Sequence, residues 1–111
     1  MKIPKSIEVA GREFKIAYPH LFQERLDVFG HTDFGAGQMY ITNKDSAGKD
    51  MAEAHLDITF WHEVFHTIDR AYCCNMIGHN ADKEDMIEGL AQGLFQVLNA
   101  NFKELEIKKN G

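Results

Sequence analysis

The sequence of 111 residues lacks the features that would place a protein in a membrane or send it out of the cell. No apolar run approaches the roughly 20 residues that a membrane span needs. The first residues, Met1 to Pro4, lead into a polar stretch and not into the apolar core of a signal peptide. We therefore expect a cytoplasmic protein with no membrane partner.

Cysteine and clustered basic residues are also scarce. The two cysteines, Cys73 and Cys74, are adjacent, which suits neither an ordinary disulfide nor a Cys-x-x-Cys metal site, so we expect reduced thiols and a buried Cys73. The formal net charge is −5, and no basic cluster exists beyond Lys108-Lys109. Because a basic patch is missing, the sequence offers no electrostatic footprint for nucleic acid.

What is present fits one compact domain that spans 1–111. A chain of this length with 44% hydrophobic residues can bury a modest core and leaves no room for a second domain. Short alternating runs and turn residues dominate its first half. They predict a hairpin of 6–10 and 12–18, a helical turn or short helix at 21–26, a bent strand and loop over 28–37, and a strand at 38–42.

Two helices are expected after the strands. Helical periodicity runs from about 50 to 76, and Gly78 would end that helix. A second helix is expected from a cap at Asn80 or Asp82 to about Asn101, followed by a frayed tail or short edge over 103–111. Its expected buried face comprises Met86, Leu90, Leu94, Val97 and Leu98. The order predicts an α+β fold, with a small, twisted, mainly antiparallel sheet packed on two helices.

The first helix contains Trp61-His62-Glu63-Val64-Phe65-His66, a match to His-Glu-x-x-His. Residues four apart on a helix share a face, so the imidazoles of His62 and His66 can bind one metal ion. Glu63 is rotated by about 100° from His62, which makes it a poor ligand but a good neighbour for a water that zinc activates. The pattern therefore predicts zinc-dependent hydrolysis with Glu63 as general base.

A helical wheel divides this helix into an apolar arc, a polar arc and a boundary between them. A side chain on the boundary can be supported by the core and still reach a cleft. The apolar arc comprises Phe60, Trp61, Val64, Phe65, Ile68, Ala71 and Tyr72; the polar arc comprises Glu63, Thr67 and Arg70; the boundary carries His55, His62, His66, Asp69 and Cys73.

A catalytic zinc site needs a third protein ligand, which we expect from the second helix. The candidates near the motif are His55, His79, Asp82, Glu84, Asp85 and Glu88. We favour Glu88, because Gly89 and Gly93 leave one side of its helix without side chains and would let the two helices approach closely. Glu84 and Asp85 fall in the first turn, where the helix N-terminus already explains a carboxylate. Glu88 could instead be an ordinary solvated carboxylate.

The motif His62-Glu63-x-x-His66 with a downstream Glu88-x-x-Ala91-Gln92 resembles the gluzincins, zinc peptidases whose third ligand is a helical glutamate. In size and order the chain is most similar to the minimal ImmA/IrrE-like metallopeptidases common in phages and mobile elements. The resemblance covers roughly 34–101 and implies a zincin-like fold that cleaves a peptide or protein substrate. Gln92 stands where many relatives carry Asp, so it can orient a ligand by a hydrogen bond but supplies no charge.

Four residues are candidates for supporting roles. Asp69 could accept the free N–H of a ligating imidazole, or pair with a basic side chain at the surface. The oxyanion of a tetrahedral intermediate needs a donor, for which His79, Tyr72 or His55 could serve, although Tyr72 also fits the core and His79 an exposed loop. If the strand at 38–42 is an edge beside the helix, an extended peptide could pair with it.

A non-catalytic adaptor or inhibitory protein, phage-encoded and stapled by zinc, is the alternative from another functional class. A fourth protein ligand, such as His79 or Cys73, would favour that alternative, whereas three ligands and an open groove would favour the enzyme. A third hypothesis is a degenerate site that holds no metal.

Overall fold

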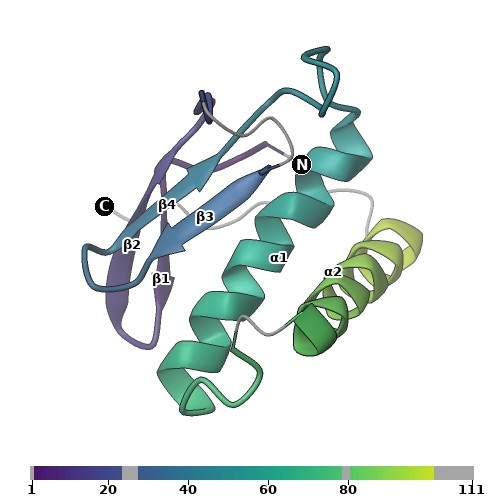
Figure 1. The fold of residues 1–111 in the computed structure, drawn as a ribbon. Coiled ribbons are helices and arrows are strands. Elements are labelled where there is room, and N and C mark those ends of the chain that lie inside the picture. The colour runs from purple at the N-terminus through teal and green to yellow at the C-terminus, as the bar shows by residue number, and fades with distance from the viewer. Residues whose placement is uncertain (1, 24–27, 79–80, 102–111) are drawn as a thin grey trace.

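The computed structural model describes residues 2–23, 28–78 and 81–101, and its strands precede its helices along the chain (Figure 1). The elements are β1 (Ser6–Val9), β2 (Arg12–Ala17), β3 (Gly30–Asp33), β4 (Gln38–Ile41), α1 (Glu53–Tyr72) and α2 (Ala81–Asn101). The α+β class, the hairpin, the strand near 38–42 and both helices are thereby confirmed. Of the expected helical turn at 21–26, residues 21–23 contain no helix but a turn at Gln23. The rest of it, the cap at Asn80 and the tail at 103–111 lie outside the described residues.

The four strands form one mixed sheet in the order β1-β2-β4-β3. The β1–β2 and β3–β4 pairs are antiparallel, and the central β2–β4 pair is parallel. Ala10 and Gly11 both have positive φ, as a two-residue hairpin turn between β1 and β2 requires. Because β2 and β4 are parallel, the chain must cross over between them. It does so by way of β3, which pairs with β4 on the side away from β2.

The strand β4 is therefore not an edge strand, and the expectation of a free edge at 38–42 is wrong. It pairs with β2 through Lys15↔Gln38 to Ala17↔Tyr40, and with β3 through Gly30↔Ile41 to Asp33↔Gln38. A high β-propensity predicts a strand but does not give its position in the sheet. Segments of high β-propensity are typical of interior strands. Within the described residues, the edge strands are β1 and β3.

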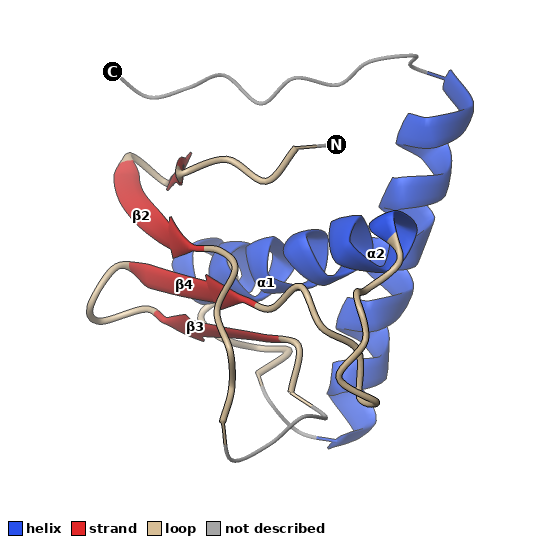
Figure 2. Cartoon of the chain, turned by 90° about the horizontal axis from the view of Figure 1, so that it is seen from above, coloured by secondary structure: helices blue, strands red, loops and turns tan. Residues whose placement is uncertain are grey.

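Helix α1 is the middle layer of the fold, with the sheet on one side and α2 on the other (Figure 2). Its Phe60 and Val64 pack with Met39 and Ile41 of β4 in the buried core. Among the described residues, α2 packs on α1 and does not reach the strands. The sheet is thus covered by one helix and not by two as expected. No helix of the described chain is both long and apolar enough to cross a membrane.

The central position of α1 buries several of its polar residues. Glu63 and Thr67, which lie on the polar arc of the helical wheel, are only 6% and 1% exposed. The wheel assumed one covered face, whereas this helix is covered from two sides. Tyr72 and Cys73 lie where α1 ends and are exposed, so the core position expected for each is wrong.

The face that α2 buries also differs from the prediction. Ile87 and Ala91 are fully buried, whereas Met86, Leu90 and Val97 are about half exposed. The predicted residues Leu94 and Leu98 are half-buried. Helical periodicity predicts a wide apolar arc on α2, and only one side of that arc is buried against α1.

Candidate metal centre

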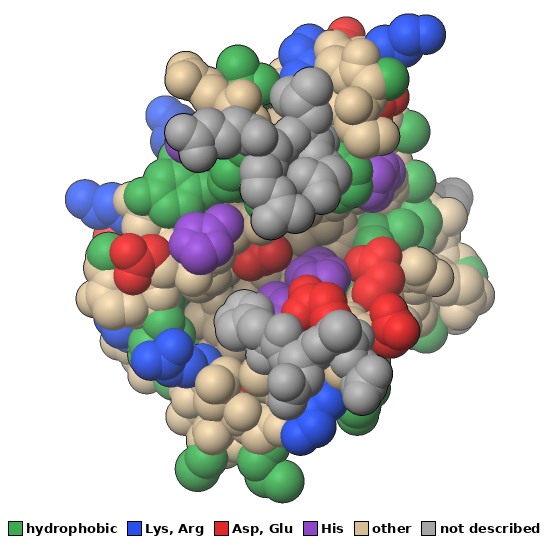
Figure 3. Space-filling view, viewed as in Figure 1, with side chains coloured by type: hydrophobic (Ala, Val, Ile, Leu, Met, Phe, Trp, Pro, Cys, Tyr) green, Lys and Arg blue, Asp and Glu red, His purple; other side chains and the backbone are tan. Residues whose placement is uncertain are grey.

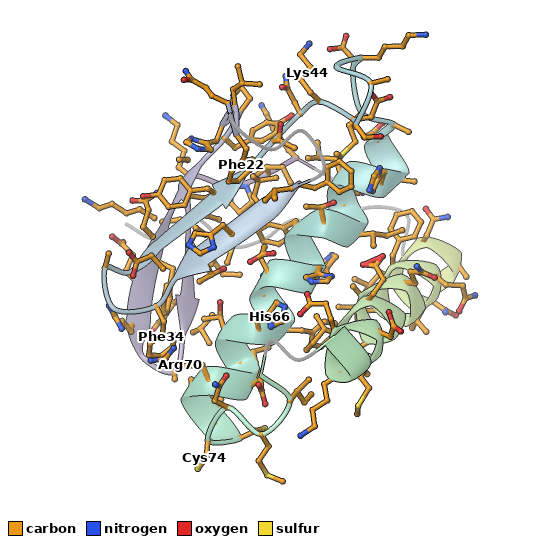
Figure 4. All side chains as sticks on the ribbon, in the orientation of Figure 1. Phe22, Phe34, Lys44, His66, Arg70 and Cys74 are labelled. Carbon is orange, nitrogen blue, oxygen red and sulfur yellow. The ribbon has the colours of Figure 1, made fainter. Side chains whose placement is uncertain are left out.

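His62 and His66 lie one turn apart on α1, and both contact Glu84 of α2. Figure 4 labels His66 on α1. Their Nε2 atoms are 3.2 Å apart. His66 is 6% exposed and His62 is half-buried, so the fold holds both rings at the junction of the two helices. The pair expected from the four-residue spacing is therefore brought together.

Glu84, from the first turn of α2, completes this group. Its Oε1 lies 2.9 Å from Nε2 of His66 and 2.5 Å from Nε2 of His62. The ligand atoms of these three residues all lie within 4.8 Å of one another, and together they could hold a metal ion. Ligands at 2.0–2.1 Å in a tetrahedron stand about 3.3 Å apart, so the separation of the two imidazole nitrogens suits zinc with little movement.

Glu88 lies on the other side of the His62 ring. Its Oε1 is 3.0 Å from Nδ1 of His62, and its Oε2 accepts a hydrogen bond from Nε2 of Gln92 at 3.2 Å. A proton on Nδ1 that is donated to Glu88 leaves the lone pair on Nε2, where Glu84 and His66 converge. Gln92, expected to orient a ligand directly, instead contacts the carboxylate that orients His62.

The carboxylate at the two Nε2 atoms is thus Glu84, whereas the sequence argument had placed Glu88 there. Gly89 and Gly93 do not lie between the helices as expected, since a Cβ added to either glycine would meet nothing within 4 Å. Both glycines are on the exposed side of α2. Glu84 and Glu88 are four residues apart and both face α1. The position of α2 along the axis of α1 decides which of the two carboxylates lies at the Nε2 atoms of both histidines.

Electrostatic coupling within the group moves two pKa values in opposite directions. Burial alone would lower the pKa of His62, but hydrogen bonds to Glu88 and Glu84 outweigh burial and raise it. Burial alone would raise the pKa of Glu84, but its hydrogen bonds to His66 and His62 outweigh burial and lower it. Both shifts favour the charged forms, so protons and a metal cation compete for the same carboxylate and nitrogen atoms.

Glu63 is not a member of this group, and its carboxylate contacts β3. Its side chain is 6% exposed, and its Oε1 accepts a hydrogen bond from Oγ1 of Thr32 at 2.8 Å. Figure 3 shows acidic and histidine side chains gathered on the face where α1 is seen between the sheet and α2. The position of Glu63 beside the histidines but outside the ligand group agrees with the rotation expected on the helix.

Thr32 and Gly30 were not singled out from the sequence as site residues. Thr32 is 31 positions before Glu63, and no motif links the two. A Cβ added to Gly30 would lie 2.8 Å from Cγ of Glu63, because β3, like β4 and β1, lies against α1. No signal in the sequence could have found this contact without the strand order.

Asp69 takes neither role that was expected of it. Its Oδ1 accepts the backbone N–H of Ile77 at 3.1 Å, and its Oδ2 accepts that of Gly78 at 3.0 Å. The side chain is 2% exposed and contacts neither an imidazole nor a surface cation in the described structure. Asp69 therefore holds the backbone at Ile77 and Gly78, just after α1.

The other proposed donors and ligands do not join the group within the described residues. Tyr72 is 68% exposed at the end of α1, and His55 packs edge-to-face on Phe29 with ring centroids 4.9 Å apart. Cys73 is exposed and is not part of the group either. His79 lies outside the described residues.

Comparisons with known proteins assign no family: no family model, curated protein or solved structure matches the chain.

Proposed function

We propose that this protein is a zinc-dependent peptidase of the gluzincin type, with His62, His66 and Glu84 as metal ligands and Glu63 as general base. The observation that carries the proposal is the convergence of two imidazole Nε2 atoms and one carboxylate oxygen next to a separate, buried glutamate. Two histidines and one glutamate are a donor set of catalytic zinc sites, which leave a fourth position open.

Glu88 and Gln92 have supporting roles in this proposal. Glu88 accepts the Nδ1 proton of His62, which fixes the tautomer and the orientation of the ring. Gln92 holds the second oxygen of Glu88, so the support extends one further side chain along α2. Glu84 and not Glu88 is then the third ligand, which revises the expectation from the sequence.

The reaction follows from the position of Glu63. Bound zinc would lower the pKa of a water molecule and polarise the carbonyl group of the scissile peptide. With zinc held by His62, His66 and Glu84, Glu63 would take a proton from the water, whose oxygen would form a bond to the carbonyl carbon as the carbonyl π bond opens. The C–N bond then breaks, and the proton is passed to the leaving amine nitrogen. Buried near the metal group, Glu63 is protected from bulk water during this transfer.

The substrate strand is proposed to pair with β3, in place of the strand at 38–42. The N–H of Thr42 donates a hydrogen bond to the carbonyl of Phe29, so these two residues are a hydrogen-bonded pair. Hydrogen-bonded and non-hydrogen-bonded pairs alternate from there along β3 and β4. In an antiparallel pair, the residues between such pairs point their N–H and C=O away from the partner strand. Gly30 and Thr32 are those residues, so their backbone groups face the outer edge and can receive an extended peptide.

The test combines metal analysis with a peptide-cleavage assay on the Glu63→Gln variant. The wild-type protein, purified without chelator, should contain one equivalent of zinc and cleave members of a degenerate peptide mixture read by mass spectrometry. Glu63→Gln should keep the zinc and lose the cleavage, because the amide preserves shape and removes the base. Glu13→Gln, on an exposed position of β2, is the matched control and should behave as wild type. Loss of zinc from Glu63→Gln, or undiminished cleavage, refutes the role.

A zinc-stapled adaptor or inhibitory protein is the second candidate, and one observation favours it. Met86, Leu90 and Val97 expose apolar surface along one side of α2. Exposed apolar surface of this kind is typical of protein-binding sites. Stoichiometric zinc with no cleavage of any peptide, together with a fourth protein ligand on the metal, would favour the adaptor over the enzyme.

A further inference from the structure

We propose that β3 positions the general base: the hydroxyl of Thr32 orients the carboxylate of Glu63, and Gly30 provides the space that this carboxylate occupies. The inference rests on the proposed function, because it concerns how the base of that reaction is held. Thr32 and Gly30 would be positioning residues, since each acts through Glu63 and neither touches the metal group.

The hydrogen bond from Thr32 supplies the orientation. Glu63 has three side-chain torsions, and burial of a carboxylate is costly unless a donor meets it. Oγ1 of Thr32 lies 2.8 Å from Oε1 of Glu63. Threonine is β-branched and stiff at χ1, so its hydroxyl is a well-directed donor. With Oε1 engaged by Thr32, Oε2 is the oxygen left to take the proton from the water in the proposed reaction.

Gly30 supplies the clearance. A Cβ at this position would lie 2.8 Å from Cγ, 2.9 Å from Oε2 and 3.1 Å from Cδ of Glu63. The first two separations are shorter than real Cβ contacts, so any side chain here would displace the carboxylate. Gly30 is not among the residues with positive φ. The backbone therefore does not require glycine, and close approach to Glu63 is the remaining reason for it.

The two residues act together because of the strand's alternation. Gly30 and Thr32 are two apart, so their side-chain positions share the face of β3 that meets α1, as their partners Ile41 and Met39 do in β4. Their backbone N–H and C=O groups point to the outer edge of the sheet. A peptide that pairs with this edge is thereby registered against the same two residues that hold the base.

The main experiment compares Thr32→Val with Thr32→Ser in the full-length, zinc-loaded protein. Valine keeps the branched shape and removes the hydroxyl, and serine restores the hydroxyl. Thr67→Val is the matched control, because the hydroxyl of Thr67 also bonds to Glu63, at 2.9 Å, but to its backbone carbonyl and not to its carboxylate. Zinc content is measured for every variant.

Two readouts are taken. The first is the ¹³C NMR signal of the Glu63 carboxylate in protein labelled at glutamate, assigned by its loss in Glu63→Gln. The second is kcat/KM on fluorogenic peptides selected from a degenerate mixture. General-base catalysis contributes about 10²–10⁴-fold, so misorientation of the base in Thr32→Val should lower kcat/KM by about tenfold. The Glu63 signal should shift in Thr32→Val, return in Thr32→Ser and stay unchanged in Thr67→Val, with zinc bound throughout.

Gly30→Ala provides an independent variant with the hydroxyl of Thr32 intact. Its crystal structure should show zinc in place and the Glu63 side chain displaced from its wild-type rotamer. An unmoved Glu63 in Gly30→Ala, or a carboxylate signal in Thr32→Val identical to that of wild type, overturns the inference. If wild type cleaves no peptide, the proposed function fails, and the NMR signal and the crystal structure still decide whether β3 positions Glu63. If wild type cleaves and Thr32→Val cleaves equally well with an unchanged signal, only the positioning role is refuted.

Discussion

Replacing Glu84 with glutamine should weaken zinc binding far more than the same change at Glu88. Glu84 places Oε1 within 2.9 Å of Nε2 of both His62 and His66, whereas Glu88 contacts only Nδ1 of His62, on the side of the ring away from that convergence. The two substitutions change charge and shape identically, on the same face of the same helix. A difference between them therefore reports their positions relative to the metal.

The magnitudes follow from what each carboxylate contacts. Small structural zinc sites with four ligands bind with about 10–16 kcal/mol, or roughly 2.5–4 kcal/mol for each ligand. Loss of Glu84 as a ligand should then cost about 10²–10³-fold in affinity. Loss of a side chain that orients a ligating histidine costs about 10–100-fold, and the glutamine carbonyl can still accept the Nδ1 proton of His62. We therefore expect about tenfold for Glu88→Gln, at the lower end of that range.

The assay is competition for zinc with a chromogenic chelator at constant pH and salt. Asp85→Asn is the control, because this exposed carboxylate lies between Glu84 and Glu88 in the sequence and its loss changes the charge equally. It should leave the affinity within about twofold of wild type, as long-range charge effects are screened. A larger loss for Glu88→Gln than for Glu84→Gln would show that Glu88 is the ligand and would refute the geometric assignment.

Thermal unfolding gives a second reading of the Glu84 substitution. Zinc that binds only the folded state raises stability according to its affinity, so Glu84→Gln should lower the Tm markedly in excess zinc. In the metal-free protein the effect should be small, because Glu84 is partly exposed and solvent screens its pairing with His62 and His66. Equal shifts with and without zinc would contradict a role in metal binding.

Three further outcomes are expected. Removal of zinc by a chelator should lower the Tm, and re-addition should restore it; no change in calorimetry would argue against a metal that couples α1 to α2. Asp69→Ala should lower the free energy of unfolding by about 2–4 kcal/mol in urea titrations, since a buried backbone N–H group at Gly78 and a part-buried one at Ile77 lose their acceptor, and a loss below about 0.5 kcal/mol would contradict this. The pKa of His62 is raised, so its contribution to the stability of the metal-free protein is complete below the ordinary pKa of 6.5 and is lost as the pH rises through the raised pKa. The pKa of Glu84 is lowered, so its contribution is complete above the ordinary pKa of 4.5 and is lost as the pH falls through the lowered pKa. The free energy of unfolding in urea, measured across this pH range, should therefore be greatest in weakly acidic solution. In His62→Ala it should fall less as the pH rises. A pH profile identical to that of wild type would exclude the interaction of His62 with Glu84.

The elements and the spacing of the motif could be predicted from the sequence because both depend on local periodicity. A repeat of about 3.6 residues per turn is enough to place His62 and His66 on one face and to turn Glu63 aside. Alternation and turn residues were enough to predict the hairpin and the strand near 38–42. Each of these statements concerns residues that are neighbours along the chain.

The order of the strands, the partner of the histidines and the support of Glu63 were decided only by the tertiary structure. The pairing of β4 on both sides left β3 as the edge against α1, which brought Thr32 and Gly30 to Glu63. The position of α2 along the axis of α1 placed Glu84, and not Glu88, at the Nε2 atoms of His62 and His66, although both carboxylates lie on the same face of α2. Such offsets are set by the packing of buried side chains between separate elements, and the period of a helix or strand holds no information about them.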